Sequence, residues 1–465
     1  MADLFWRSTK KPGKSAGSQP APESSKFKKY QNETADAWDA ADDELVKGFG
    51  VDPDASRSAA LAVLARYSKS PKSPPPAPQE STSKSSSNNI PKQKLNIPPK
   101  ENAATNSNTE ESKTKPKSPI IVSPGPPNKS FTGLPPLTDA QIARSEKFSS
   151  AINRDLTDLA DLRELAWRGC PPCYRPICWR LITGLLPTAR ERRLATLEKK
   201  RNEYWKLVDR YFKLSKEPSH KDTYHQITID IPRTNPSVPL FQQKLIQELM
   251  ERILFIWAIR HPASGYVQGM NDLVTPFLHV FLSEHLRAGE KFETTNMDLI
   301  PQEALREVEA DCFWCLGWLL DGIQDNYTFA QPGIQRQVSQ LEDLIERIQP
   351  DLFQHLQENS VQFLQFAFRW FNNLLMRELP LSAIVRLWDS YFSEAGADER
   401  SSLHLFVCAA FLIHWKRLLL DQCDFQGLMM TVQGLPTNGW GESEISEILA
   451  KAFMLRSTYT LKQLS

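Results

Sequence analysis

Apolar residues recur at intervals of three and four from about residue 140 almost to the end of the chain. This is the spacing of amphipathic helices, and no segment shows a convincing alternation at period two. Proline or glycine marks the short connections. The pattern predicts helices at residues 159–166, 176–185, 190–212, 239–261, 268–286, 302–323, 333–357, 361–378, 381–392, 402–420, 424–433 and 442–456. We therefore expect an all-α fold for the C-terminal two-thirds of the chain.

The first 139 residues lack this pattern and are rich in Pro, Ser and Lys, with more than half of the chain's 34 prolines. Such a composition cannot bury enough apolar surface to form a core, so residues 1–139 are predicted to be disordered. Residues 68–137 have the low complexity of a flexible, partly polyproline linker. Four serines there precede proline and are candidate phosphorylation sites, although a linker without any regulated site fits equally well: Ser70, Ser73, Ser118 and Ser123.

Two segments of this tail differ from the linker. Residues 31–54 are strongly acidic and include Trp38, and residues 54–67 are rich in Ala and Leu. Acid and proline at residues 52–54 favour a helix start, so 54–67 is read as a short helix that folds on contact with a partner. Plain disorder is the alternative. Readers of Pro-rich or phospho-Ser segments, or an adaptor protein, are the candidate tail-binding proteins.

Charge and cysteine content narrow the function further. The formal net charge is +1, which argues against a dedicated nucleic-acid binder. The seven cysteines are an odd number and no apolar leader precedes them, so a reducing cytoplasmic location with free thiols is expected. Apolar runs are shorter than a membrane span, so membrane association is expected only through partners. The two CxxC pairs do not have zinc-module spacing, and no metal site is expected.

Two polar, non-periodic segments interrupt the helical pattern, and the first is residues 227–236. Pro232 is expected to push Ile231 into an extended conformation and to end any helix there. Arg233 would then stand on a stiff loop, with Asp230 three residues back to brace the loop or neutralise the charge. A rigidly held guanidinium suits the stabilisation of phosphate charge. The alternative is a surface Arg paired with Asp230.

The second segment is residues 264–271, in which Gly265 and Gly269 permit tight backbone geometry. Tyr266 and Gln268 stand two residues apart, and a helix follows at once. An amide at a helix start can position a water molecule. The alternative is ordinary helix capping by Gln268 or Asn271.

Taken together, Ile227-x-x-Asp230-x-x-Arg233 and Tyr266-x-Gln268 resemble the two signature motifs of the TBC domain, which is found in GTPase-activating proteins for Rab GTPases. Stretches similar to two further motifs of the same family are also present. The one after Gly169, with Arg175 and Trp179, is similar to its opening motif, and the ones at 370–371, 377–380 and 386–389 are similar to its late motif. The resemblance covers about residues 164–396, with helices of the same fold continuing to about 460. The residues of both signature motifs, at 227–236 and 264–271, are similar to those of the Golgi Rab/Ypt branch of the family.

The resemblance implies a mechanism in which two side chains are supplied to a Rab GTPase in trans. Arg233 would be an arginine finger on the β/γ phosphate oxygens, and Gln268 a glutamine finger that positions the attacking water. Asp230 would hold the Arg loop, Tyr266 and Asn271 would shape the Gln loop, and the supporting residues of the opening motif would be Arg175 and Trp179. GTP and Mg²⁺ belong to the partner, so the chain is expected to need no cofactor and to have no hydrolase activity of its own.

The same resemblance places the protein in vesicle trafficking, peripherally at Golgi membranes, so an adaptor that binds the tail would be a Golgi adaptor. The rival reading is a non-catalytic Rab-binding adaptor or scaffold, which intact Arg233 and Gln268 count against and the acidic, Pro-rich tail modestly favours. An exposed aromatic helix is compatible with a homodimer.

Overall fold

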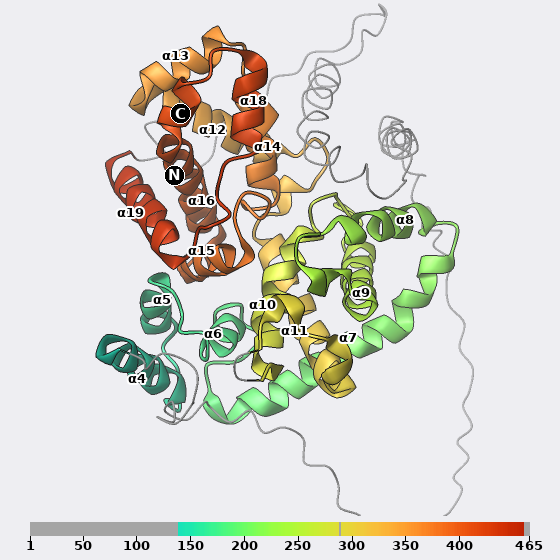
Figure 1. Ribbon diagram of the computed structural model, residues 1–465. Helices are drawn as coiled ribbons and strands as arrows, with labels where there is room; N and C mark the ends of the chain where they lie inside the picture. Colours follow the sequence, from blue (N-terminus) through green and yellow to red (C-terminus); the bar gives the residue numbers. More distant parts are fainter. Residues whose placement is uncertain (1–137, 288–289, 460–465) are drawn as a thin grey trace, which may run out of the picture. The chain divides into compact units, whose positions relative to one another are not determined.

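The computed structural model describes residues 138–287 and 290–459 (Figure 1). All regular structure in these residues is helical, apart from one isolated antiparallel bridge between Leu156 and Ala189. The all-α prediction is therefore confirmed for this part of the chain. Most of the predicted disordered region 1–139 lies outside the described residues, and so do the helix predicted at 54–67, the linker predicted at 68–137 and its four serines. Thr138 and Asp139 are described and begin a helix, so the prediction of disorder is wrong at these two positions.

The first half of the described residues forms eight α-helices joined by short turns. They are α4 (Asp139–Asn153), α5 (Leu159–Trp167), α6 (Arg175–Ile182), α7 (Arg193–Tyr211), α8 (Lys221–Asp230), α9 (Lys244–Arg260), α10 (Thr275–Leu282) and α11 (Gln302–Asp321). Short 3-10 turns flank or join them: η1 (Arg190–Arg192), η2 (Phe212–Lys216), η3 (Ile231–Arg233), η4 (Pro239–Gln242), η5 (Asp272–Val274), η6 (Ser283–His285), η7 (Phe292–Thr294) and η8 (Met297–Leu299).

The second half begins with the 3-10 turn η9 (Gln324–Asn326). It continues with α12 (Pro332–Ile348), α13 (Pro350–Glu358), α14 (Phe363–Asn372), α15 (Leu381–Ser393), α16 (Ala397–His414), α17 (Lys416–Leu420), α18 (Phe425–Gln433) and α19 (Glu442–Thr458). Helices α16 and α19 pack together, as do α12 and α14, and α15 lies against α5 (Figure 1).

Several helix boundaries differ from the sequence prediction for local reasons. The block predicted at 333–357 is two helices, because Pro350 cannot donate to the helix ladder and begins α13 instead. The block at 402–420 also divides, at Trp415 between α16 and α17. Helices α4 and α8 were not predicted. A capping box at Thr138 starts α4, with the Thr138 side chain accepting from the Gln141 N–H.

An aromatic cluster joins α6, α10 and α15 at the centre of the core. Trp179 lies edge-on to Phe392 with ring centroids 4.8 Å apart, and Phe277 lies edge-on to Trp388 at 5.5 Å. All four rings are buried. Edge-to-face contacts of this kind stabilise beyond simple area burial. The cluster fixes the N-terminal helices against the later ones.

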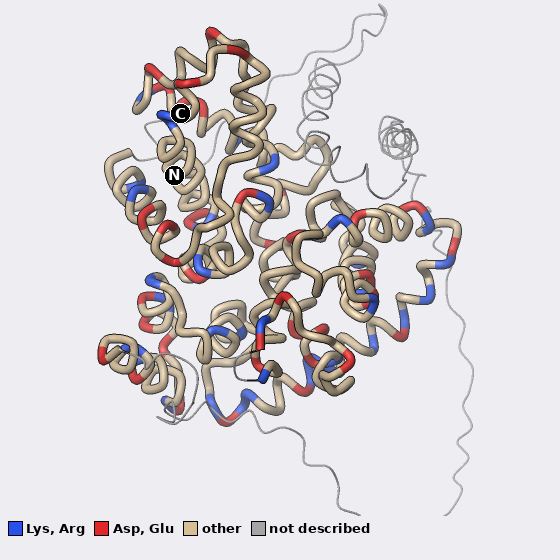
Figure 2. Tube along the Cα trace, in the orientation of Figure 1, with Lys and Arg blue, Asp and Glu red and all other residues tan. Residues whose placement is uncertain are grey.

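Basic and acidic positions are interspersed along α7 (Figure 2). Arg201 forms ion pairs with Glu307 and Asp311, each at 2.7 Å. Lys199 and Lys200 lie within 3.9 and 3.6 Å of Glu203 carboxylate oxygens. Three consecutive basic residues of this helix, at 199–201, are thus paired with acids. Between residues 138 and 459, leaving out 288–289, no helix combines the length and apolarity that a membrane span needs.

Candidate functional site

The Arg233 segment continues a helix instead of interrupting it. Helix α8 runs to Asp230, and η3 follows directly with Ile231 at φ −59° and ψ −47°. The prediction of an extended Ile231 is therefore wrong. A residue before proline disfavours the helical region without being excluded from it. Pro232 lies in the first positions of a new 3-10 turn, where a missing N–H costs no ladder bond.

The Gln268 segment is a loop between α9 and η5, and its glycines have the geometry expected from the sequence. Gly265 has φ +63° and Gly269 has φ +99°, both in the left-handed region that favours glycine. The Gly265 N–H donates to the His261 carbonyl at 2.8 Å, which closes the loop onto the end of α9. Gln268 is half-buried, as is Arg233 on the other segment.

Two side-chain hydrogen bonds join these segments directly. The Tyr266 hydroxyl donates to Asp230 Oδ2 at 2.9 Å, and Asn271 Nδ2 donates to Thr234 Oγ1 at 2.9 Å. Thr234 Oγ1 in turn donates to the Asp230 carbonyl at 3.2 Å. We call these four residues, Asp230, Thr234, Tyr266 and Asn271, the finger network. It brings Arg233 and Gln268, which are 35 residues apart in sequence, onto one interlocked platform.

Three of the four residues of the finger network are buried, and Tyr266 is half-buried. Asp230 is 3 % exposed, Asn271 1 % and Thr234 0 %. Asn271 also shapes its own loop, because its Oδ1 accepts from the Gly269 N–H at 3.0 Å. Buried side chains with several hydrogen bonds lose little freedom on binding a partner, so the platform is preorganised.

Burial is the largest influence on the ionisation of Asp230. It raises the pKa of this carboxyl to about 6, against the opposing effect of hydrogen bonds from Gln226 and Tyr266 and of the charges on Arg233 and Arg377. Burial and the neighbouring carboxylate raise the pKa of the Tyr266 hydroxyl as well, so it remains a donor at neutral pH. A carboxyl whose pKa is shifted by burial and by a specific charged neighbour is common at functional sites.

Sequence reasoning missed three residues that support the Gln268 loop from outside it. Arg377 Nε donates to Asp272 Oδ2 at 2.8 Å, and Asn372 Nδ2 donates to the Gln268 carbonyl at 3.0 Å. Thr234 is the third. Arg377 lies in the stretch that resembles the late motif, so a signal was present. No local pattern indicated that Asn372 reaches a loop 104 residues away.

The two supporting residues of the opening motif lie in a different cluster. Arg175 Nε lies 3.1 Å from both oxygens of Asp389, and Trp179 Nε1 donates to Asp389 Oδ1 at 2.8 Å. The Cys170 N–H donates to Asp389 Oδ2 at 2.7 Å. We call these four residues the Asp389 cluster. Their hydrogen bonds connect α6 and the turn before it to α15. A supporting role for Arg175 and Trp179 in the site itself stays a prediction.

The cysteines show no metal-site arrangement in the part of the chain that the structure describes. All seven are free thiols, and five of them are buried. No group of three or more His, Cys, Asp or Glu side chains within residues 138–287 and 290–459 is arranged to hold a metal ion. Burial raises the pKa of the Cys170, Cys312 and Cys315 thiols, which are therefore not activated nucleophiles.

A comparison with known families decides the assignment. The family model described as the Rab-GTPase-TBC domain matches residues 172–420. The chain belongs to this family. The chain is 46 % identical over 449 residues to human TBC1 domain family member 22B, a match that covers 93 % of this chain and 86 % of the relative. Human TBC1 domain family member 22A is 42 % identical, over 94 % of this chain and 87 % of the relative.

Yeast relatives and a solved structure agree with the assignment. The GTPase-activating protein gyp1 of Schizosaccharomyces pombe is 48 % identical over 70 % of this chain and 63 % of its own length. The crystal structure of the Ypt/Rab-GAP domain of Gyp1p superposes with a TM-score of 0.64 at 44 % identity, covering 69 % of this chain and 99 % of that one. The TBC fold read from the sequence motifs is therefore confirmed.

Proposed function

We propose that this TBC protein is a GTPase-activating protein for Rab GTPases and that Arg233 and Gln268 are the two fingers it supplies in trans. The family match supports the first part, and so does the GTPase-activating function for which the gyp1 relatives are named. The intact finger motifs and the finger network that joins them support the second.

The chemistry requires both side chains at one phosphate. A Rab hydrolyses GTP slowly, because charge developing on the transferred phosphoryl group is not neutralised and the attacking water is poorly placed. Arg233 offers a permanent positive charge to that group, and Gln268 offers an amide that can accept from and donate to the water. Arginine fingers of this kind accelerate hydrolysis by about 10³–10⁵. GTP and Mg²⁺ come with the partner.

The single observation that carries the proposal is the interlocking of the two finger segments. Arg233 follows Asp230 by three residues and precedes Thr234, while Gln268 lies between Tyr266 and Asn271. The Tyr266–Asp230 and Asn271–Thr234 hydrogen bonds therefore bracket both fingers. Fixing two groups relative to each other lowers the entropic cost of assembling the transition state. A binding surface without turnover has no need of this arrangement.

A Golgi location in vesicle trafficking, peripheral and cytoplasmic, is part of the same proposal and rests on the resemblance to the Golgi Rab/Ypt branch. The second candidate function is a non-catalytic Rab-binding adaptor. The acidic stretch around Trp38 and the Pro-rich linker favour it, and both lie outside the described residues. Tail-binding proteins and a homodimer stay predictions.

The test is single-turnover GTP hydrolysis by a panel of purified Rabs, with wild type, Arg233→Ala and Gln268→Ala. Arg154→Ala and Gln354→Ala are matched controls. Arg154, just after α4, is half-exposed in an ion pair with Asp161 of α5, and Gln354 is exposed on α13. We expect one or a few Rabs to be accelerated by about 10³ or more, with each finger variant losing most of this and each control retaining it. Binding of a Rab without acceleration would instead support the adaptor.

A further inference from the structure

The backbone of the glutamine finger is held from a distant helix. Asn372 Nδ2 donates to the Gln268 carbonyl at 3.0 Å, and Asn372 is the last residue of α14. The Asn372 side chain is fully buried. This hydrogen bond is made to Gln268 itself, whereas the finger network contains the neighbouring residues Tyr266 and Asn271.

The end of α14 is fixed in turn by side chains of the segment that includes η9. A helix C-terminus leaves carbonyl groups without helical partners. Here the Tyr327 hydroxyl donates to the Asn372 carbonyl at 2.6 Å, and Asn326 Nδ2 donates to the Phe371 carbonyl at 3.4 Å. Both donors are buried. Asn372 therefore has a defined backbone position from which its amide can hold Gln268.

The turn that follows α14 has an unusual backbone. Leu374 has φ +53° and Leu375 has φ +65°. Left-handed geometry is uncommon for leucine, and two such residues in succession persist only where the surroundings impose them. The Leu375 N–H donates to the Trp370 carbonyl at 3.1 Å, which reverses the chain just after Asn372. Such backbone outliers cluster at functional sites.

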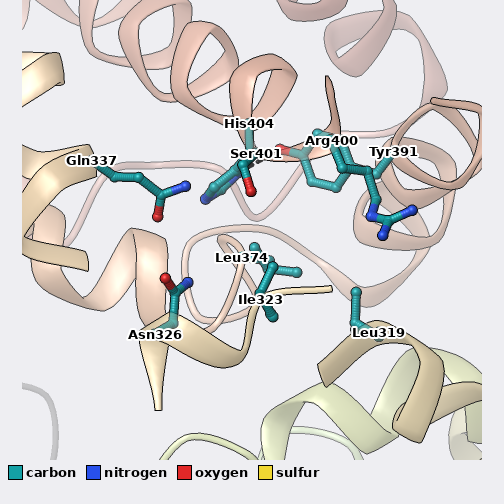
Figure 3. Close-up of a pocket in the computed structure, with 9 residues that line it drawn as sticks. All are labelled: Leu319, Ile323, Asn326, Gln337, Leu374, Tyr391, Arg400, Ser401 and His404. Atoms are coloured by element: carbon teal, nitrogen blue, oxygen red, sulfur yellow. Dashed lines mark hydrogen bonds between the residues drawn. The ribbon is translucent and has the colours of Figure 1, made fainter. Parts of the chain in front are cut away.

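Close packing is incomplete on the far side of this turn. Leu374 and Asn326 border a cavity of about 10 Å³, with Gln337 and His404 among the other lining residues (Figure 3). That is space for about one water molecule. Gln337 Oε1 has no hydrogen-bond partner among the described residues. The void gives Leu374 no packing contact on this side. The position of the turn therefore depends more heavily on the hydrogen bonds that Tyr327 and Asn326 donate to the end of α14.

Asn372 is not a fully satisfied structural amide. Its Oδ1 is buried without a partner in the described part of the chain, and so are both polar atoms of the adjacent Asn373 side chain. An unsatisfied buried polar atom destabilises a protein. An apolar residue of similar size would suit a purely structural position better. What the Asn372 side chain does provide is its donor to Gln268.

We propose that Asn372 is a positioning residue for the glutamine finger, held in place by Tyr327. This inference rests on the proposed function, since it assigns a role within the same site. By fixing the Gln268 carbonyl, Asn372 sets the height and direction from which the Gln268 side chain reaches the attacking water. Displacement of a catalytic group by about 1 Å can cost about 10²-fold in rate.

The test measures single-turnover GTP hydrolysis with Asn372→Ala and with Asn372→Leu, which is similar in size, has no hydrogen-bond donor and is kept in case the cavity left by Asn372→Ala impairs folding. Asn359→Ala is the matched control. Asn359 also lies at a helix end, but its Nδ2 donates to His355 of its own helix at 2.9 Å. We expect about 10- to 100-fold slower hydrolysis with either Asn372 variant, and an unchanged rate with Asn359→Ala.

A merely structural role is separated by combining Asn372→Ala with each finger variant. If Asn372 acts through Gln268, the substitution changes the rate by less than about 2-fold in Gln268→Ala and keeps its full effect in Arg233→Ala. An equal loss in both backgrounds, or no loss in wild type, overturns the inference alone, provided that both finger variants are themselves impaired. Finger variants as active as wild type overturn the proposed function and the inference together.

Discussion

Two buried clusters of this TBC domain are each centred on an aspartate and differ in what surrounds it. Asp389 accepts from Arg175, Trp179 and a backbone N–H, and lies in an ion pair with N···O of 3.0 Å to Arg175 Nη2. Asp230 accepts from the neutral side chains of Gln226 and Tyr266, and burial raises its pKa to about 6. The guanidinium of Arg175 balances the charge of Asp389, whereas burial makes ionisation of Asp230 unfavourable.

This difference separates a cluster that holds the fold from one that serves a site. The Asp389 cluster connects α6 to α15. Asp389, Trp179 and Cys170 are buried and Arg175 is only 16 % exposed, so removal of the cluster should affect folding. The finger network supports two half-buried side chains that we propose to reach a partner. Its removal should affect rate more than stability. Four substitutions test this contrast, from the largest expected effect to the smallest.

The largest effect is expected for Arg233→Ala. Hydrolysis by the substrate Rab should slow by about 10³-fold or more, or about 4 kcal/mol of transition-state stabilisation. The free energy of unfolding should change by no more than about 1 kcal/mol, because Arg233 is half-buried and lies outside the apolar core. Single-turnover kinetics and urea denaturation measure the two. A comparable loss of stability would mean that Arg233 belongs with the Asp389 type of cluster.

The opposite outcome is expected for Asp389→Ala. Removing the carboxylate leaves the Arg175 guanidinium without its ion-pair partner, and the Cys170 and Trp179 donors without an acceptor. The free energy of unfolding should fall by about 3–5 kcal/mol. Urea denaturation measures it, with the half-exposed Arg154–Asp161 pair as a control that should lose less than about 1 kcal/mol on Arg154→Ala. A loss no larger than the control's would remove the basis of the comparison.

Asp230→Asn should flatten the dependence of stability on pH. The folded-state pKa of about 6 lies above the ordinary value of 3.8 for an aspartate, so the folded state binds more protons between these values. Stability contributed by the protonated carboxyl is complete below pH 3.8 and is lost as the pH rises through 6, by about 3 kcal/mol in all. Wild type should show this fall and the variant should not. Urea denaturation from pH 4 to 7 measures the free energy of unfolding of both proteins. If it changes with pH equally in wild type and variant, the account of Asp230 is wrong.

The smallest effect is expected for Tyr266→Phe, which removes one hydrogen bond and keeps the ring. We expect a loss of about 1–2 kcal/mol, appearing mainly as about 5- to 30-fold slower hydrolysis. The pKa of Asp230 should rise further, because the hydrogen bond that lowers it is gone. Single-turnover kinetics and thermal unfolding measure the two effects. A lower unfolding temperature with an unchanged hydrolysis rate per folded molecule would contradict this prediction.

The sequence allowed most of the helices to be predicted, and the two candidate finger segments to be singled out, because their signals are local. Helical periodicity located α11, α15 and α19 to within a few residues. The left-handed geometry at Gly265 and Gly269 follows from residue type, and the structure confirms it. Arg233 and Gln268 stood out because polar, irregular segments interrupted an apolar pattern.

The rest depends on contacts between segments far apart in the chain. The bonds from Asn372 to Gln268 and from Asn271 to Thr234 join positions with no shared local pattern. Ile231 shows the limit of a local rule, because packing of α8 and η3 on α9 outweighs the preference of a residue before proline. Arg175 and Trp179 were assigned by motif alone, and only the structure showed that Asp389 is their common partner.

The most direct test of the central claim uses a substrate Rab whose own water-positioning glutamine has been changed to alanine. If Gln268 supplies that function in trans, wild-type protein should still accelerate GTP hydrolysis by this Rab by about 10³-fold or more, and Gln268→Ala should not. If wild-type protein accelerates the normal Rab but leaves the altered one at its basal rate, Gln268 does not position the water. The dual-finger account would then be contradicted.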